Sequence, residues 1–237
     1  MKILLLCLLL VTASSFTEAA EKMNICETGK MQSPINIDTS TVKRLSHAEK
    51  IISFYKPVFF KFTIEDGSFK AKPLIDGNVL IRNGKPYPLQ EFHFHHKSEH
   101  TINGQPFPME LHIVHKSKDG KQMVVGVLIE EGTENKEFKE LLSSLKTIQK
   151  GQSKSLQAPI NLNELFSSET DVYRYVGSFT TPPCTEPVLW LIKKEPITLS
   201  WEQIQAFQHL VGTNNRSIQP LNEREISLTK IQQSSSK

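Results

Sequence analysis

The chain has 237 residues, of which 38% are hydrophobic and 22% are charged, and its formal net charge at neutral pH is +3. This composition is typical of a globular protein, and the length is sufficient for one good core in a single domain. The small net charge and the scattered lysines argue against a surface built for nucleic acid or for an anionic membrane.

The first twenty residues predict a secretory signal peptide. Lys2 precedes an apolar run at residues 3–11, and small residues follow up to Ala20, which is the usual order of charged region, hydrophobic region and cleavage zone. An uncleaved membrane anchor is the alternative, but the run is too short to span ~30 Å of hydrocarbon. The tail from about residue 230 is polar and carries no lipid-anchor signal. We therefore expect a secreted, extracellular protein whose domain occupies residues 21–237.

Export changes what the cysteines predict. Cys7 would leave with the signal peptide, so Cys26 and Cys184 would remain in an oxidising compartment. Two cysteines allow one intramolecular pairing, and we predict this disulfide, which is worth ~4 kcal/mol in the chain-entropy description. The Asn-Arg-Ser sequon at Asn215 predicts a glycan if the host glycosylates the protein.

Turn signals recur along the mature chain between apolar segments. Asp-Gly or Asn-Gly pairs occur at residues 66–67, 76–77, 83–84, 103–104 and 119–120. Such pairs between alternating segments predict a succession of strands joined by turns.

Two apolar strands and a few short helices complete the expected elements. Residues 122–129 predict a central strand buried on both faces, and residues 188–192 predict a second apolar strand. Apolar spacing predicts a helix at 134–145, a second helix capped by Ser200, and a short helical turn at 161–166. The pattern therefore predicts a β-dominated α+β fold in a single domain, with the helices at the periphery.

Two segments alternate apolar and polar residues with the period of a β-strand, Glu-Phe-His-Phe-His ending at His95 and Glu-Leu-His-Ile-Val beginning at Glu110. Side chains two residues apart share a face of a strand. If the strands lie close in one sheet, His93, His95 and His112 converge on that face. Three neutral nitrogen ligands with an open fourth position are typical of a catalytic zinc site.

Two glutamates share the face of these histidines. Glu91 and Glu110 each lie two residues before a candidate ligand. Each carboxylate can accept the free ring N–H of a ligand, which fixes the tautomer and orientation of the imidazole. We therefore predict both as outer partners of the Zn²⁺ ligands.

The other five histidines do not share this pattern. We expect His47 and His209 to be ordinary surface or core residues. His100 and His115 are predicted to be hydrogen-bonded structural residues, and His96 has no explanation from the sequence.

A different metal-binding fold fits part of the pattern. His93, His95 and Glu99 have the spacing of the first motif of the cupins, which are β-proteins that hold Mn, Fe or Zn. The second cupin motif, a glycine-rich lead to another histidine and an asparagine, is absent around His112 and His115. The cupin interpretation is therefore disfavoured.

Further motifs favour one family over the others. They are Gln-Ser-Pro-Ile-Asn-Ile at 32–37, Ser-Glu-His at 98–100, Glu-Leu-His at 110–112, Gly-Ser-Phe-Thr-Thr-Pro-Pro-Cys at 177–184 and Gln-Pro-Leu-Asn at 219–222. In this order, over most of the mature chain, they resemble the α-class carbonic anhydrases. The resemblance implies a twisted, mostly antiparallel central sheet of about ten strands with zinc at the base of a conical cleft. It also implies reversible hydration of CO₂ to bicarbonate and a proton, and secreted members of this family place their disulfide as Cys26 and Cys184 would.

The resemblance also implies roles for individual residues. Zinc held by three histidines would lower the pKa of bound water from about 15.7 to ~7 and supply a zinc-bound hydroxide as the nucleophile. Thr180 would accept the hydrogen bond of that hydroxide and donate its own to Glu99, so these two would be the catalytic pair. The substrate pocket would be lined by Val114, Val124, Phe179, Thr180, Thr181 and Trp190.

Three departures from the family pattern have predicted consequences. Glu91 replaces the usual glutamine, and a carboxylate there is expected to raise the pKa of the zinc-bound water. Ser68 lies near the usual position of the proton-shuttle histidine, so we expect no shuttle residue and a dependence of turnover on buffer. The aromatic segment usual before Cys26 is missing, which is expected to affect stability more than chemistry. His96 replaces a tryptophan.

The expected partner is a small molecule, CO₂ or bicarbonate, and the expected state is a monomer, with an oligomer left open. The alternative function is a catalytically weak, carbonic-anhydrase-like secreted binding or matrix protein. The intact ligands His93, His95 and His112 argue against this alternative.

Overall fold

The computed structural model describes residues 25–45, 49–65, 68–145, 148 and 151–234. The predicted signal peptide, His47 and the turn at 66–67 lie outside this part of the chain, and the side chain of Ser68 is not described either. Within the described residues, no helix is long and apolar enough to cross a membrane.

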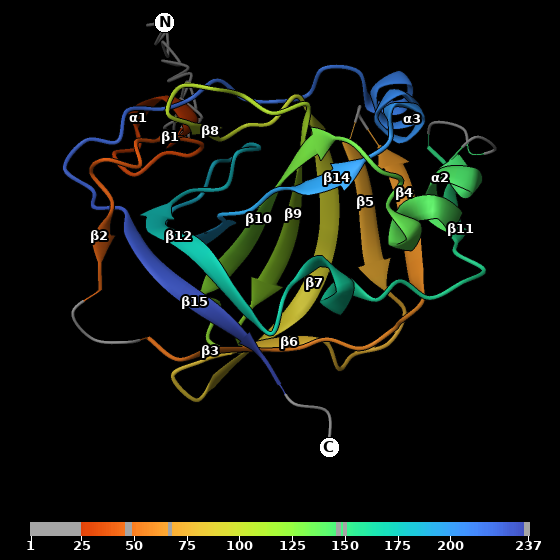
Figure 1. Ribbon diagram of the computed structural model, residues 1–237, viewed down its shortest axis with the longest axis horizontal. Coiled ribbons are helices and arrows are strands. Elements are labelled where there is room, and N and C mark those ends of the chain that lie inside the picture. The colour runs from red at the N-terminus through yellow and green to blue at the C-terminus, as the bar shows by residue number, and fades with distance from the viewer. Residues whose placement is uncertain (1–24, 46–48, 66–67, 146–147, 149–150, 235–237) are drawn as a thin grey trace, which may run out of the picture.

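Most strands of the described chain belong to one large twisted sheet (Figure 1). They are β2 (Lys43–Arg44), β3 (Ile51–Phe54), β4 (Phe60–Glu65), β5 (Ser68–Pro73), β6 (Val79–Arg82), β7 (Lys85–His96), β9 (Met109–Lys116), β10 (Gln122–Glu131), β11 (Ser153–Ser155), β12 (Glu169–Gly177), β13 (Val188–Lys193), β14 (Ile197–Leu199) and β15 (Ser227–Gln233). Two short strands, β1 (Asn36–Ile37) and β8 (Thr101–Ile102), form a separate parallel pair.

The thirteen strands that the structure describes in this sheet follow the order β11-β4-β5-β7-β6-β3-β15-β12-β13-β10-β14, with β9 between β7 and β10 and β2 beside β15. Among the described strands of this sheet, only the pairs β10–β13, β10–β14, β15–β2 and β15–β3 are parallel. The prediction of a mostly antiparallel sheet is therefore confirmed. The sheet has more strands than the ten or so expected because β2, β11 and β14 are edge pieces of two or three residues.

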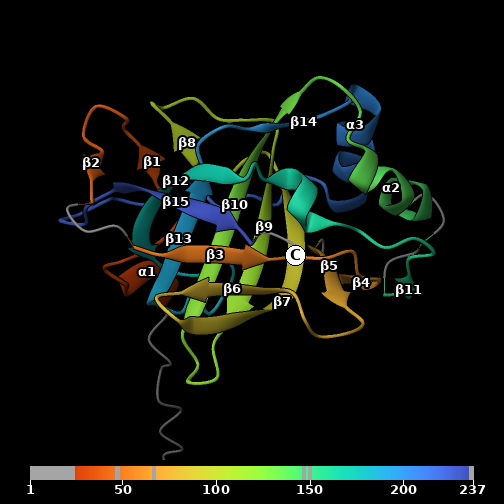
Figure 2. The same cartoon turned by 60° about the horizontal axis from the view of Figure 1, so that its bottom comes forward.

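The helices are short and lie at the periphery of the sheet, as predicted (Figures 1 and 2). They are α1 (Ile25–Thr28), α2 (Lys139–Leu145) and α3 (Trp201–Val211), with 3₁₀ turns η1 (Lys136–Phe138) and η2 (Leu162–Leu165). The helix expected at 134–145 starts as η1, whose N-cap Asn135 accepts from the backbone N–H of Glu137, and continues as α2. Ser200 and Gln203 form a reciprocal capping box at the start of α3, as expected from the sequence. The sequence did not predict α1.

Two apolar clusters lie on either side of the strands that carry the histidines. Phe92 and Phe94 of β7 point into the larger cluster, where Phe94 packs on Phe207 of α3 with ring centroids 4.2 Å apart. The smaller cluster contains Val114, Trp190 and their neighbours. Burying each aromatic side chain of the larger cluster contributes roughly 1.5–3 kcal/mol. The alternating strands are thus anchored from behind, and this holds the histidines on the other face.

The predicted disulfide is present. Cys26 in α1 is bonded to Cys184, which follows β12 in the loop that carries the Thr-Thr-Pro-Pro motif. The bridge joins segments 158 residues apart in the sequence and so ties the first described residues to that loop.

Candidate metal centre

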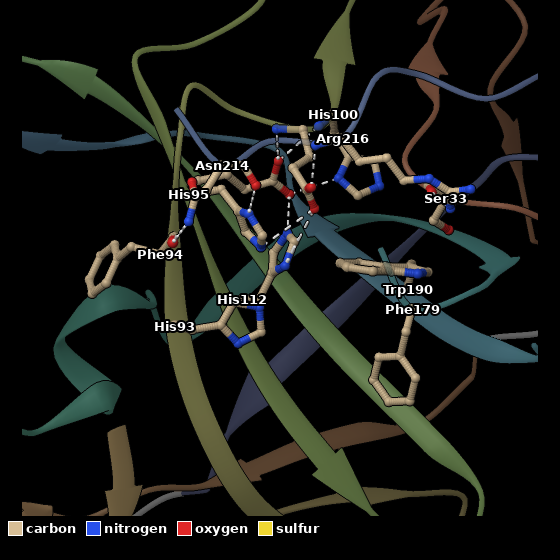
Figure 3. Close-up of polar contacts among 12 residues, drawn as sticks. Ser33, His93, Phe94, His95, His100, His112, Phe179, Trp190, Asn214 and Arg216 are labelled. Carbon is tan, nitrogen blue, oxygen red and sulfur yellow. Dashed lines mark hydrogen bonds and ion pairs between the residues drawn. The ribbon is translucent and has the colours of Figure 1, made fainter. Parts of the chain in front are cut away.

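Strand register brings the three predicted ligands together. β7 and β9 are antiparallel with His93 opposite His112, and His95 lies opposite Glu110. Directly opposed residues project from the same face of a sheet. The ring centroids of His93, His95 and His112 are therefore only 4.6–5.2 Å apart (Figure 3).

Polar contacts on the outer ring nitrogens leave one nitrogen of each imidazole facing the others. His95 Nδ1 donates to the backbone carbonyl of Asn214 at 3.2 Å, and His112 Nε2 donates to Glu110 Oε1 at 3.0 Å. His93 Nδ1 lies 3.3 Å from Glu91 Oε1, although this contact falls short of hydrogen-bond geometry. The inward atoms are consequently Nε2 of His93 and His95 and Nδ1 of His112.

Burial keeps the three rings neutral. It lowers the pKa of His93, His95 and His112 below the usual histidine value, even though neighbouring carboxylates act in the opposite direction. A neutral imidazole is the form that binds a metal ion.

Glu110 is the centre of a buried hydrogen-bond network. Its Oε1 accepts from the rings of His112 and His100, and its Oε2 accepts from the backbone N–H groups of Glu99 and His100 at 2.8–2.9 Å. Burial alone would raise the pKa of Glu110, but the two rings hold it well below the usual range. The carboxylate is therefore ionised, and it fixes His112 in the tautomer that leaves Nδ1 free.

His100 passes this network on to a loop far away in the sequence. Its Nε2 accepts from the Tyr175 hydroxyl at 2.6 Å, and that hydroxyl bonds to Ser33 Oγ at 2.8 Å. Ser33 in turn exchanges two hydrogen bonds with Ser178. His100 is thus a hydrogen-bonded residue, as expected, and the network connects His112 to the loop of Thr180.

Glu99 lies at the inner edge of the histidine cluster. Its Oε1 accepts from the backbone N–H of Arg216 at 2.7 Å. Its Oε2 is buried without a hydrogen-bond partner, 3.5 Å from His95 Nε2 and 3.9 Å from His112 Nδ1. Thr180 is buried, four residues before Cys184 of the disulfide. Among the described residues, no hydrogen bond joins Glu99 and Thr180, so their predicted contact stays a prediction.

The predicted substrate residues of the sheet form one row beside the histidines. Val114 lies opposite Val124, and Val124 lies beside Trp190 in the neighbouring strand. All three are buried, and the half-buried Phe179 packs against their cluster. Thr181 is exposed in the adjacent loop. The row gives the histidine face an apolar side.

Glu91 begins the same row, opposite Val114 and next to a bulge in β7. Burial would raise the pKa of Glu91, but its contact with His93 and the charges of Lys70 and Lys72 hold it below the usual range. It is therefore a carboxylate beside His93, as the departure from glutamine predicts. The shuttle prediction for Ser68 falls outside the described side chains.

Two further histidines have identifiable surroundings. His115 is fully buried and its Nε2 is bonded to the Tyr55 hydroxyl at 2.8 Å, which agrees with the structural role expected. The backbone N–H of His96 donates to Asn214 Oδ1 at 2.9 Å. Nothing in the structure explains the buried ring of His96.

Residues 214–216 position the site, a role that the sequence did not predict. Asn214 binds the ring of His95 and the backbone of His96. The Arg216 guanidinium donates to Gln32 Oε1 and to the carbonyls of Ser33 and Cys26. In the sequence, this segment stands out only by the sequon at Asn215, which is half-buried between them, because no short-range pattern reports partners more than 100 residues away.

The donor set fits a zinc ion. One atom from each of His93, His95 and His112 lies within 4.8 Å of the others, and the buried Nε2 of His95 has no hydrogen-bond partner. Nitrogen ligands of this number suit a catalytic zinc with an open position. A second possible group in the described residues, His100, Glu110 and His112, consists of atoms already bonded to one another and is the network above.

Comparison with known proteins gives a consistent result. A family model described as eukaryotic-type carbonic anhydrase matches residues 16–230. The carbonic anhydrase of Neisseria gonorrhoeae is 37% identical over 213 residues, which cover 90% of this chain and 82% of the relative.

Solved structures agree with this match. The α-carbonic anhydrase from Thermovibrio ammonificans, in complex with the inhibitor sulfanilamide, is 35% identical with a TM-score of 0.79, covering 86% of this chain and 89% of that one. Dioscorin complexed with ascorbate is 29% identical with a TM-score of 0.80, covering 90% of each chain.

Proposed function

Because the chain belongs to the eukaryotic-type carbonic anhydrase family, its activity is the reversible hydration of carbon dioxide, and we propose that His93, His95 and His112 hold the zinc ion for it. The observation that carries this assignment is the convergence of three neutral imidazoles within 4.8 Å. When bound, zinc acts as a Lewis acid that lowers the pKa of a water molecule to ~7.

The residues around the histidines prepare them as ligands. Glu110 and the carbonyl of Asn214 accept the outer N–H groups of His112 and His95. Each hydrogen bond holds its ring in one tautomer and one orientation and makes the inner nitrogen a better donor. Glu91 is proposed to do the same for His93, since it lies 3.3 Å from Nδ1.

Glu99 and Thr180 are proposed as the pair that orients the attacking oxygen. The orphaned Oε2 of Glu99 supports this role, because a buried carboxylate oxygen beside two candidate ligands has a strong need for a donor. The Thr180 hydroxyl would donate to that oxygen, and its own lone pairs would then accept a hydrogen bond from the nucleophile.

The apolar row is proposed to bind the gas. Carbon dioxide is small and carries no charge, so it gains from contact with Val114, Val124 and Trp190 rather than from hydrogen bonds. Phe179 packs on the same cluster. The two residues that follow it, Thr180 and Thr181, would contact bicarbonate as it forms.

Export of the protein, a glycan at Asn215 and a monomeric state complete the proposal. A disulfide at Cys26 and Cys184 supports an oxidising compartment, and the leading apolar run supports a signal peptide. N-terminal sequencing, intact mass and sedimentation of the exported protein check these three statements.

Stopped-flow CO₂ hydration by the zinc-loaded mature protein, at several buffer concentrations, tests the function. We expect activity that rises with buffer, because no shuttle histidine is predicted and buffer must then carry the proton. The matched variant Thr180→Val should lose most of this activity while its zinc content stays at one per chain. No hydration above background, with zinc verified, would contradict the proposal and favour a secreted binding protein of the same fold.

A further inference from the structure

Lysines flank the histidine cluster on the same face of the sheet, and the proposed function uses none of them. β5 pairs with β7 so that Lys70 lies opposite His93, just as His112 lies opposite His93 on the other side. Opposed side chains share a face, with their Cβ atoms roughly 4.5–5.5 Å apart. Lys70 is therefore the immediate cross-strand neighbour of a candidate ligand.

Two further lysines extend this feature away from the cluster. Lys72 lies two residues beyond Lys70 on the same face, and Lys61 of β4 is its cross-strand partner. Lys70 is half-buried, whereas Lys61 and Lys72 are exposed. We call these three residues the lysine rim.

The burial pattern confirms which face the lysine rim occupies. Phe62 and Ala71, which alternate with the lysines, are fully buried in the larger apolar cluster. That cluster lies behind the histidines, so the lysines project from the front of the sheet. They stand on the opposite side of the histidines from the apolar row of Val114, Val124 and Trp190.

The charge of the lysine rim is largely uncompensated. Among the described side chains, no carboxylate lies within the 4.0 Å salt-bridge distance of any of its three ammonium groups. Lys70 and Lys72 act electrostatically on Glu91, whose own contact is with His93. Glu91 is therefore the carboxylate nearest to these lysines, and the apolar row on the other side of the histidines carries no charge.

We propose that the lysine rim is a subsite for small monoanions, bicarbonate in the working enzyme, next to the histidine cluster. This inference rests on the proposed function for its ligand. Carbon dioxide is neutral and suits the apolar row, but the hydrated product is an anion, which the lysine rim attracts. Apolar walls beside a charged patch focus its field. The half-buried position of Lys70 beside His93 fits a small ion better than a macromolecule.

The size of the effect follows from Coulomb's law. A unit charge some 8 Å away in a water-like medium changes the affinity for a monoanion about two- to threefold. Removing two lysines should therefore weaken anion binding by up to about tenfold, while Lys70→Arg, which keeps the charge, should leave it unchanged.

The test uses thiocyanate as the probe and compares the parent with Lys70→Gln/Lys72→Gln, with Lys70→Arg and with Lys118→Gln. Lys118 is an exposed lysine in the turn after β9 and is the matched control for lost charge. Binding is followed first by ¹H–¹⁵N spectra of the metal-free protein and then by the visible spectrum of the cobalt-substituted protein. Circular dichroism verifies that each variant is folded.

We expect saturable shifts at amides of β5 and β7 in the parent, and up to about tenfold weaker binding in the double glutamine variant. Lys70→Arg and Lys118→Gln should behave as the parent. Equal thiocyanate affinity in the parent and the double variant would contradict the proposed anion subsite at the lysine rim, without contradicting the proposed metal centre. A cobalt spectrum that never responds to thiocyanate would contradict the proposed function. The spectra of the metal-free protein would still show whether the lysine rim binds the anion.

Discussion

Glu110 shows how one residue determines the state of its neighbours. A fully buried carboxylate is ordinarily unfavourable, but here four N–H groups donate to its two oxygens. Removing part of such a network leaves other buried groups unsatisfied, and this costs more than the bond itself contributes. The consequence reaches the metal centre because two of the four donors are the rings of His100 and His112.

We predict that Glu110→Gln weakens zinc binding about 10- to 100-fold. The glutamine side chain has one accepting oxygen, and an NH₂ group replaces the other. This NH₂ group would face N–H donors that in the parent donate to a carboxylate oxygen. A chelator competition titration at neutral pH measures the zinc affinity. The matched control is Glu49→Gln, since Glu49 is also a mostly buried carboxylate but is held by Arg82 and Arg174. Equal zinc affinity in Glu110→Gln and the parent would show that the network does not orient His112.

Glu91 differs from Glu110 because it is less buried and has a looser contact. Its carboxylate lies 3.3 Å from His93 Nδ1 and makes that ring a more basic ligand. We predict that Glu91→Gln lowers the apparent pKa of the pH–rate profile for CO₂ hydration, because a weaker electron donor leaves more positive charge on the ion. Glu91→Asp keeps the charge and serves as the control. An apparent pKa that is the same in Glu91→Gln and in the parent would contradict this prediction.

At the scale of elements, β10 has a glycine, Gly126, at a position where neighbouring side chains leave no room for a Cβ atom. A Cβ at Gly126 would lie 2.6 Å from Ile192 Cδ1 and 2.8 Å from Glu110 Oε1. Gly126 is also the cross-strand partner of His112. The bare backbone there makes the room that the Glu110 carboxylate occupies.

We predict that Gly126→Ala destabilises the protein by about 1–3 kcal/mol and also weakens zinc binding, because the new methyl group displaces Glu110. Gly132→Ala is the matched control, since its Cβ would be similarly crowded, 2.8 Å from Thr198 Cγ2, but away from Glu110. Urea unfolding and zinc titration of both variants separate the two effects. The idea fails if both glycine variants lose stability but bind zinc equally well.

Local patterns predicted the elements better than their connections. Alternation identified the strands that carry His93, His95 and His112, because a two-residue period is visible within five residues. Helix α3 was expected because Ser200 and Gln203 form a capping box three residues apart. The contacts of Asn214 and Arg216, in contrast, join segments separated by 117–190 residues, and no periodicity reports such pairs.

At the scale of the whole molecule, the order of strands decides which side chains meet. The sheet places β5 directly beside β7, although β6, which forms a hairpin with β7, lies between them in the sequence. This neighbourhood puts Lys70 opposite His93, which the sequence alone did not suggest. The same twisted sheet buries a large core behind the histidines, and a titratable group lies within that core.

His115 is this group, and it predicts how the stability of the whole molecule depends on pH. Burial lowers the pKa of His115 to about 3 in the folded protein, whereas in the unfolded chain it is about 6.5. Above pH ~6.5 the ring is neutral in both states and contributes no pH dependence. Below that value the unfolded chain takes up a proton that the folded protein excludes. The free energy of unfolding therefore falls by about 1.4 kcal/mol per pH unit until the pH approaches the folded pKa.

We predict that His115→Gln removes this component, because glutamine does not titrate and its carbonyl can still accept from the Tyr55 hydroxyl that now binds His115. The variant should be less stable than the parent at pH 7. Its loss of stability between pH 7 and pH 4.5 should nevertheless be smaller by about 2–3 kcal/mol. Urea unfolding of the metal-free proteins at several pH values measures both quantities. His209→Gln, at an exposed histidine of α3, should follow the parent. Parallel curves for His115→Gln and the parent would mean that the buried ring is not what makes the fold sensitive to acid.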